Sequence, residues 1–279
     1  MFKRIFGFVL VLVVAYVAYE WMTFPNVSQL EDQWPKTTAF MEQRKAELRA
    51  EGKDDTIQYQ PVPYSQISPY LRRAVLVSED NDFYEHNGVD VDALKEAIRK
   101  DWERGQITRG GSTITQQLAK NLYLSPSRNP LRKIKEYFIA RSLENHLSKK
   151  RILELYLNVV EMGERVYGAE AASRAYFHTS AASINPSQAA LLAGCLPNPR
   201  GMNPGSPNKR LRARQSIILS RLRRWGYLVE EQVLTEKTAP APQTETTVTT
   251  ESTESTETTE TTDTTGTTDT TPPPTTTTQ

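Results

Sequence analysis

The chain has 279 residues, of which 38% are hydrophobic and 24% charged, so it is long enough to bury one large core or two small ones. Its single cysteine, Cys195, excludes an intramolecular disulfide, and its three histidines match no usual zinc spacing. The formal net charge is +1, but residues 1–237 hold all 34 basic residues and only 26 of the acidic ones. This basic body suggests a polyanionic partner: nucleic acid, anionic lipid headgroups or a phosphorylated substrate.

The amino terminus predicts a membrane anchor. Lys3 and Arg4 precede an uncharged run from Ile5 to Tyr19, and after Glu20 the segment continues without charge to Phe24. As a helix this segment is about 30 Å long, the thickness of a bilayer core. The two cations predict a cytoplasmic amino terminus with the rest of the chain outside. A cleaved signal peptide is the alternative, but the segment lacks a good small-x-small cleavage site.

The middle of the chain is predicted to form one α-rich domain. Residues 29–52 are charged and helix-prone, which predicts a solvated helical spacer, and residues 56–64 alternate like a short edge strand. Polar caps followed by proline mark helix starts at Ser68, Asn129 and Asn185, Asp90 is a further cap, and Gly105 and Gly226 mark stops. The predicted helices span 69–78, 91–104, 113–122, 130–147, 149–159, 168–177, 186–195 and 207–225.

The carboxyl-terminal segment has a composition that excludes a packed core. Of the 42 residues from Thr238, 22 are threonine, mixed with Glu, Asp, Ser and Pro. Such a segment cannot bury enough apolar surface to offset its ordering entropy, so it is predicted to be disordered. A solubilising tail and a mucin-like stalk are both compatible with this composition.

A first candidate site lies in the pattern Glu79-Asp80-x-x-Phe83-x-x-His86-x-Gly88. Adjacent carboxylates at a helix end beside aromatic residues can have different pKa values, so that one keeps the character of a general base. A solvated acidic loop with Phe83 packed into the core is the structural alternative.

A second candidate segment runs from Arg109 to Asn121. Its glycines precede a helix whose first turns carry hydroxyl and amide donors for sugar hydroxyls or phosphates. The pattern of a nucleotide-binding P-loop is absent, so nucleotide hydrolysis is not indicated. An ordinary capped helix after a glycine-rich turn is the alternative.

A third candidate segment, Arg132 to Glu136, follows Lys120 and Arg128 and is strongly basic. Arg132 and Glu136 are four residues apart and share a helix face, which is compatible with an intrahelical ion pair. The functional alternative is a clamp that stabilises a departing diphosphate.

Two further segments indicate packing. Residues 149–158 place Ile152, Leu155 and Tyr156 at helical spacing, which predicts a core helix. Gly168 and Ala172 are four residues apart, and small residues at this spacing predict close helix contacts.

Together these five segments, in this order and spacing, resemble the family 51 peptidoglycan glycosyltransferases, in particular the monofunctional biosynthetic transglycosylases with one membrane anchor. The resemblance covers residues 59–226. It implies a mostly α, lysozyme-like glycosyltransferase domain behind one amino-terminal transmembrane helix. The implied domains are residues 1–24 as the anchor, 25–55 as a juxtamembrane connector, 56–237 as the enzyme and 238–279 as the Thr/Glu-rich tail.

The resemblance also implies an inverting hexosyltransferase that polymerises lipid II into β-1,4-linked glycan with release of polyprenyl diphosphate. Glu79 matches the general base, and Glu136 matches a second motif glutamate, which either orients the clamp or holds a divalent ion. The matching diphosphate- and substrate-binding positions are Lys120, Arg132, Lys133, Gln117, Ser112, Thr113 and Asn121.

The cofactor and partners follow from the same resemblance. Mg²⁺ or Mn²⁺ would accompany the substrate diphosphate, without a dedicated protein metal site. The expected partners are lipid II, the nascent glycan strand, membrane lipid and other cell wall synthesis proteins, with no nucleic acid. The expected location is the cytoplasmic (inner) membrane, with the catalytic domain on the periplasmic or outer face and residues 89–102 and Ile107 as the region that dips into the bilayer.

Two other functions remain as alternatives. A lytic transglycosylase or lysozyme-like hydrolase also uses one glutamate in a related fold, but cutting uncharged glycosidic bonds gives no reason for Lys120 and Arg132 beside it. An inactive peptidoglycan-binding module would tolerate loss of these residues, and the chain keeps all of them.

Overall fold

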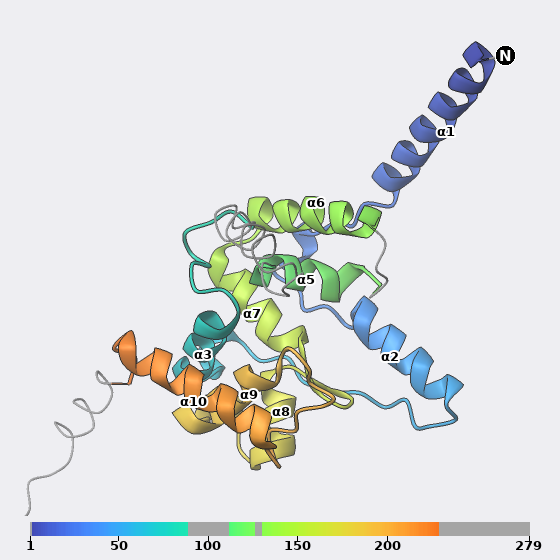
Figure 1. Cartoon of the computed structure of the whole chain (residues 1–279). Helices are drawn as coiled ribbons and strands as arrows, with labels where there is room; N and C mark the ends of the chain where they lie inside the picture. Colours follow the sequence, from blue (N-terminus) through green and yellow to red (C-terminus); the bar gives the residue numbers. More distant parts are fainter. Residues whose placement is uncertain (1, 89–111, 126–129, 229–279) are drawn as a thin grey trace, which may run out of the picture. The chain divides into compact units, whose positions relative to one another are not determined.

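The computed structural model describes residues 2–88, 112–125 and 130–228 (Figure 1). Contacts divide the chain into two compact units, Met1–Thr238 and Ala239–Gln279, and the second lies outside the described residues. The predicted helix over 91–104, the cap at Asp90, the stop at Gly105 and the proposed membrane-dipping region also fall outside them.

The described part of the chain is mostly helical, as the sequence predicts. The α-helices are α1 (Phe2–Met22), α2 (Ala39–Ala50), α3 (Pro69–Glu79), α5 (Ile114–Tyr123), α6 (Pro130–His146), α7 (Lys149–Val159), α8 (Ala169–Phe177), α9 (Pro186–Cys195) and α10 (Lys209–Arg224). Short 3₁₀ turns cover Ser28–Leu30, Tyr64–Gln66 and Ala181–Ser183. The predicted helices over 149–159 and 186–195 are confirmed at both ends, and the other predicted helices among the described residues differ from their predicted bounds by one or two residues at one or both ends.

Two groups of helices surround the core. Helix α5 packs against α6 and α7 and also contacts α2, while α3, α9 and α10 pack against one another (Figure 1). Leu118, Leu143 and Leu153, from α5, α6 and α7, are completely buried in one apolar cluster with residues of α3 and α9. Helix α5 therefore contacts α2, α6 and α7, and side chains on its different faces pack against different helices.

The predicted caps explain where several helices begin and end. The Asn185 side chain accepts a hydrogen bond from the backbone N–H of Gln188 at 2.9 Å. The Gln188 side chain accepts one from the backbone N–H of Asn185, so the two residues form a capping box at the start of α9. At the end of α10, Gly226 has a φ of +75° and the N–H of Tyr227 donates to the Leu222 carbonyl. This Schellman arrangement uses the left-handed conformation that glycine tolerates.

The strand predicted over 56–64 is much shorter in the structure. Only Gln58–Tyr59 forms β1, which pairs in parallel with β3 (Val166–Tyr167), while β2 (Glu161–Gly163) pairs antiparallel with β3. Because β3 offers only two residues to its partner, the ladder cannot extend along the whole alternating segment.

The prediction of a solvated spacer over residues 29–52 is wrong for its helical part. Met41 and Leu48 are each 2% exposed, and Arg44 is also buried. Met41, Arg44 and Leu48 lie three and four positions apart, so they share one face of α2 that packs on the domain. Apart from Arg44, the charged residues that suggested solvation occupy the other faces.

The prediction for the single cysteine is confirmed. Cys195 is buried, as predicted, and burial raises the pKa of its thiol to about 12, so it is an inert core side chain. Within the residues that the structure describes, no helix combines the length and the apolar character needed to cross a membrane.

Candidate active site

Glu79 is the last residue of α3, where the helix reaches the polar part of the site. Leu71, Ala74 and Val75 are completely buried and fix the helix against the core. The half-buried Glu79 carboxylate accepts a hydrogen bond from the Gln117 side-chain amide of α5, with 3.1 Å between Nε2 and Oε2. The Ser78 hydroxyl also donates to Glu79 Oε1 at 3.2 Å, and a carboxylate with two donors still keeps lone pairs for a substrate hydroxyl.

The orientation of the Gln117 amide is itself fixed. The hydroxyl of Tyr156, on α7, donates to Gln117 Oε1 at 2.9 Å, so the Gln117 NH₂ group must face Glu79. Tyr156 is completely buried, and burial raises the pKa of its hydroxyl well above the ordinary value, with Glu79 adding to the shift. Tyr156 therefore stays a neutral donor, and the sequence analysis missed this contact of the candidate site.

Asp80, the second carboxylate of the first motif, has a structural role. Its Oδ2 accepts the backbone N–H of Ile114 at 2.8 Å, in the first turn of α5, and its Oδ1 lies 2.9 Å from His86 Nε2. His86 Nδ1 accepts from the Gly88 N–H, so Nε2 carries the ring proton and donates to Asp80. Asp80 thus ties the end of α3 to the start of α5, which sets Glu79 beside Gln117.

We expect Asp80→Asn to lower the free energy of unfolding by about 2 kcal/mol. Either the Ile114 N–H or the His86 Nε2–H then faces the NH₂ group of the new amide instead of a carboxylate oxygen, and its hydrogen bond is lost. Urea denaturation followed by circular dichroism measures the change. Asp82→Asn, in the same loop but exposed, is the matched control and should leave stability unchanged. Equal stability of the Asp80 and Asp82 variants would contradict the structural role.

Lys120 lies one turn after Gln117 on α5 and carries a largely buried ammonium group. Burial lowers the pKa of Lys120, while the carboxylates of Glu136 and Glu79 act to raise it. No hydrogen bond or ion pair holds this ammonium in the described part of the chain, and the ring of Phe40 lies 5.7 Å from Nζ. The Lys120 ammonium thus interacts electrostatically with both Glu79 and Glu136, so we treat the two carboxylates as parts of one candidate site.

Glu136, on α6, is only 2% exposed and is paired with two cations. Arg132 NH1 donates to Glu136 Oε2 at 2.9 Å, which confirms the predicted intrahelical pair, and Lys133 Nζ donates to Oε1. Lys133 Nζ also donates to the exposed Ser112 hydroxyl at 3.2 Å, so it joins α6 to the residues ahead of α5. Both carboxylate oxygens of Glu136 are therefore engaged.

The remaining predicted binding residues hold α5 in place. Thr113 is its N-cap, accepts the Gln116 N–H at 3.2 Å and donates to the Gly88 carbonyl at 2.6 Å. Asn121 is buried and donates to the carbonyl of Gln117. The structure thus brings Glu79, Gln117 and Lys120 to one region with Glu136 and its two cations, whereas Thr113 ties the start of α5 to Gly88 and Asn121 acts within the helix.

The small residues of the fifth segment confirm the predicted close packing. Gly168 has a φ of +85°, and a Cβ placed on it would lie 2.2 Å from the Asn158 carbonyl oxygen. Only glycine fits at this junction between α7 and α8. The Asn158 side chain in turn bonds both backbone groups of Val62.

Comparison with known proteins gives the family of the chain. The Transglycosylase family profile matches residues 45–223. The biosynthetic peptidoglycan transglycosylase of Methylobacillus flagellatus is 43% identical over 225 residues, 80% of this chain and 98% of the relative. That of Dechloromonas aromatica is 47% identical over 188 residues, 67% of this chain and 81% of the relative. The chain therefore belongs to the transglycosylase family, with the biosynthetic peptidoglycan transglycosylases as its relatives along most of its length.

Proposed function

We propose that this chain polymerises lipid II into β-1,4-linked glycan at the site that contains Glu79 and Lys120. The chain is a peptidoglycan glycosyltransferase that makes glycan strands for cell wall synthesis. The observation that carries the assignment of the site is that Gln117, which donates to the Glu79 carboxylate, lies one turn before the largely buried Lys120 on α5, so that the ammonium interacts electrostatically with Glu79. This combination offers a proton acceptor and a group that binds a phosphate.

Glu79 serves as the general base in this proposal. It takes the proton from the 4-hydroxyl of the acceptor GlcNAc as that oxygen attacks C1 of the donor MurNAc. The C1–O bond to the α-linked diphosphate breaks and a β-1,4 bond forms, so the configuration at C1 inverts, through an oxocarbenium-like state such as glycosidases use. Tyr156 supports this step by holding the Gln117 amide that fixes the carboxylate.

Lys120, Arg132 and Lys133 would hold the diphosphate that leaves. The charge that develops on the bridging oxygen is stabilised best by cations already in place before the bond breaks. Glu136 orients Arg132 and Lys133 through its two engaged oxygens, so we assign it an orienting role in the clamp. Ser112 contributes by fixing the Lys133 ammonium.

A divalent cation does not fit the protein groups of the clamp. Glu136, for which a metal ligand was one of the two roles left open, already has both oxygens engaged by cations. The described residues also include no group of three or more His, Cys, Asp or Glu side chains that could hold a metal. Mg²⁺ or Mn²⁺ would therefore bind the substrate's own phosphate oxygens, and no step proposed here depends on it.

The membrane location is also part of the proposal. Its support is the uncharged run after Lys3 and Arg4, together with large exposed apolar side chains on α1. Helix α6 adds a second apolar surface, because Leu131, Ile134 and Phe138 are 49%, 54% and 57% exposed and share one face. Since α6 also carries the clamp residues, this stripe would place the clamp at the depth of lipid headgroups.

We expect Ile134→Glu with Phe138→Glu to weaken binding of the full chain to anionic vesicles, because charges replace the apolar stripe. Flotation of the protein with vesicles measures this binding. Substitution of the exposed Ile217 on α10 by Glu is the matched control and should leave flotation unchanged. Unchanged flotation of the α6 variant would remove this surface from the proposal.

The lysozyme-like cleft and the other cell wall synthesis proteins as partners stay predictions.

The function is tested by incubating the detergent-solubilised full chain with labelled lipid II and separating the products by size. Long glycan that lysozyme digests is the expected product. Shortened fragments from added peptidoglycan, with no polymer from lipid II, would instead support the lytic alternative. Absence of both products would favour a binding module.

A further inference from the structure

Helix α2 places an aromatic ring beside the Lys120 ammonium. Thr38 caps the helix by accepting the Met41 N–H at 3.2 Å, and both residues are 2% exposed, so the first turn of α2 is firmly seated. Phe40 lies between them and its ring centroid is 5.7 Å from Lys120 Nζ. Phe40 is half-buried and is not part of the described core cluster, so core packing does not account for its position.

A ring at this point suits a lysine that must stay charged and yet bind a phosphate. Burial lowers the pKa of Lys120, and Arg132 and Lys133 lower it further by repulsion. An aromatic face stabilises a desolvated cation through its quadrupole without accepting any of the three ammonium protons as a carboxylate would. The donors of Lys120 therefore remain available for the oxygens of a diphosphate.

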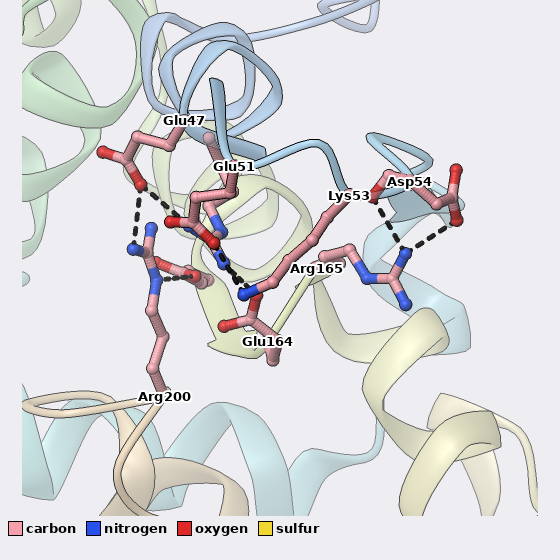
Figure 2. Close-up of polar contacts among 9 residues, drawn as sticks. Glu47, Glu51, Lys53, Asp54, Glu164, Arg165 and Arg200 are labelled. Carbon is pink, nitrogen blue, oxygen red and sulfur yellow. Dashed lines mark hydrogen bonds and ion pairs between the residues drawn. The ribbon is translucent and has the colours of Figure 1, made fainter. Parts of the chain in front are cut away.

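A network of charges at the middle of α2 holds the helix against the rest of the domain. The Arg44 guanidinium, on a side chain that is 8% exposed, pairs with Glu47 at 3.0 Å and with Glu164, in the turn between β2 and β3. Arg200, in the loop after α9, reaches Glu47 at 3.1 Å and Glu161 at 2.7 Å, and Figure 2 shows it extending toward Glu47.

The signs of the charges alternate along this network, from Glu164 through Arg44, Glu47 and Arg200 to Glu161. Hydrogen bonds, the first from Gln43, lower the pKa of Glu47, and the bond to Glu164 raises the pKa of Arg44, so this part of the network stays charged at neutral pH. Two separate elements of the fold, the turn between β2 and β3 and the loop after α9, are thus tied to α2, one to two turns after Phe40.

We propose that α2 is part of the catalytic apparatus and that Phe40 is a positioning residue for Lys120. The proposal rests on the role of Lys120 in diphosphate binding given above. The ring keeps the ammonium charged and directed at the site, and the network around Arg44 keeps the ring in place. The segment that the sequence predicts to be a connector thereby contributes to the reaction.

The test compares Phe40→Leu, which keeps an apolar side chain but removes the ring, with Phe40→Tyr, which restores it. We expect kcat/KM for lipid II to fall about three- to tenfold in Phe40→Leu and to stay near wild type in Phe40→Tyr. The alkaline limb of the pH profile should move about half a pH unit lower in Phe40→Leu, because the charged form of Lys120 loses stabilisation. Phe177→Leu, which removes a ring packed on the core, is the control and should not move this limb.

A double-mutant cycle with Lys120→Met separates positioning from general packing. Once the ammonium is gone, Phe40→Leu should have no further effect on kcat/KM, and equal effects in both backgrounds would overturn the proposal. Wild-type behaviour of Phe40→Leu would overturn it as well. Unchanged turnover in Lys120→Met alone would instead refute the diphosphate role, so the two failures are distinguishable. Urea denaturation of every variant checks that each one is folded under the assay conditions.

Discussion

Replacing Glu79 by Gln is expected to slow glycan polymerisation about a hundred- to ten-thousand-fold, the usual contribution of a general base. The amide is nearly the same size as the carboxylate and can still accept the hydrogen bond from Gln117 Nε2, so the surrounding contacts remain. It cannot take a proton from the acceptor hydroxyl. The loss should therefore appear in kcat, with binding of labelled lipid II retained.

The matched control for this variant is Glu85→Gln. Glu85 lies six residues further along in the same loop, and its side chain is exposed. It should polymerise lipid II at the wild-type rate. If Glu85→Gln and Glu79→Gln lose the same activity, or neither loses any, Glu79 is not the base.

The second large effect is expected for Lys120→Met, which removes the charge while preserving most of the length of the side chain. Loss of one fixed group that stabilises developing charge lowers turnover about a hundred- to a thousandfold. Because burial already lowers the pKa of Lys120, the apolar substitute suits its surroundings, and the fold should be kept. Steady-state kinetics with lipid II, together with thermal unfolding, measures both quantities.

Lys53→Met provides the control for this loss of charge. Lys53 pairs with Glu51, and both side chains are largely exposed, so the pair contributes little to stability or to the site. Its activity should equal that of the wild type at the same ionic strength. Activity of Lys120→Met within a few-fold of this control would mean that the ammonium does not bind the leaving diphosphate.

Most of the helices could be predicted because their ends depend on local chemistry. Asn185 and Gly226 satisfy backbone groups within a few residues of themselves, so a short window of sequence contains the whole signal. The strand near Gln58 shows the opposite case. Its length depends on Val166 and Tyr167, more than 100 residues away, and the alternating pattern alone carries no information on how much partner strand exists.

The site could be predicted as a set of residues but not as a set of contacts. The spacing of Arg132 and Glu136 gives their ion pair directly, because residues four apart on a helix are neighbours. Nothing local indicates that Asp80 would cap α5 while Glu79 would not, since the two are adjacent and chemically alike. A buried Tyr156 requires a hydrogen-bond partner, and this requirement was the available signal for its contact with Gln117.

The contribution of α2 could not be seen in the sequence. Phe40 and Lys120 are 80 positions apart, and the charged residues of α2 favour a solvated helix. The Thr38 cap and the spacing of Met41, Arg44 and Leu48 were the only local signs of a packed face. Charge on a helix therefore predicts solvation poorly where a buried charged side chain, such as that of Arg44, forms ion pairs that fix the helix to the domain.

The most direct test follows both products of the reaction at once. The full chain is given lipid II labelled in its polyprenyl chain and in its sugars, and the released polyprenyl diphosphate is counted against the new glycosidic bonds. The account predicts equal amounts of the two, in glycan that lysozyme digests, and neither product with Glu79→Gln. Cleavage of added peptidoglycan without release of polyprenyl diphosphate would contradict it.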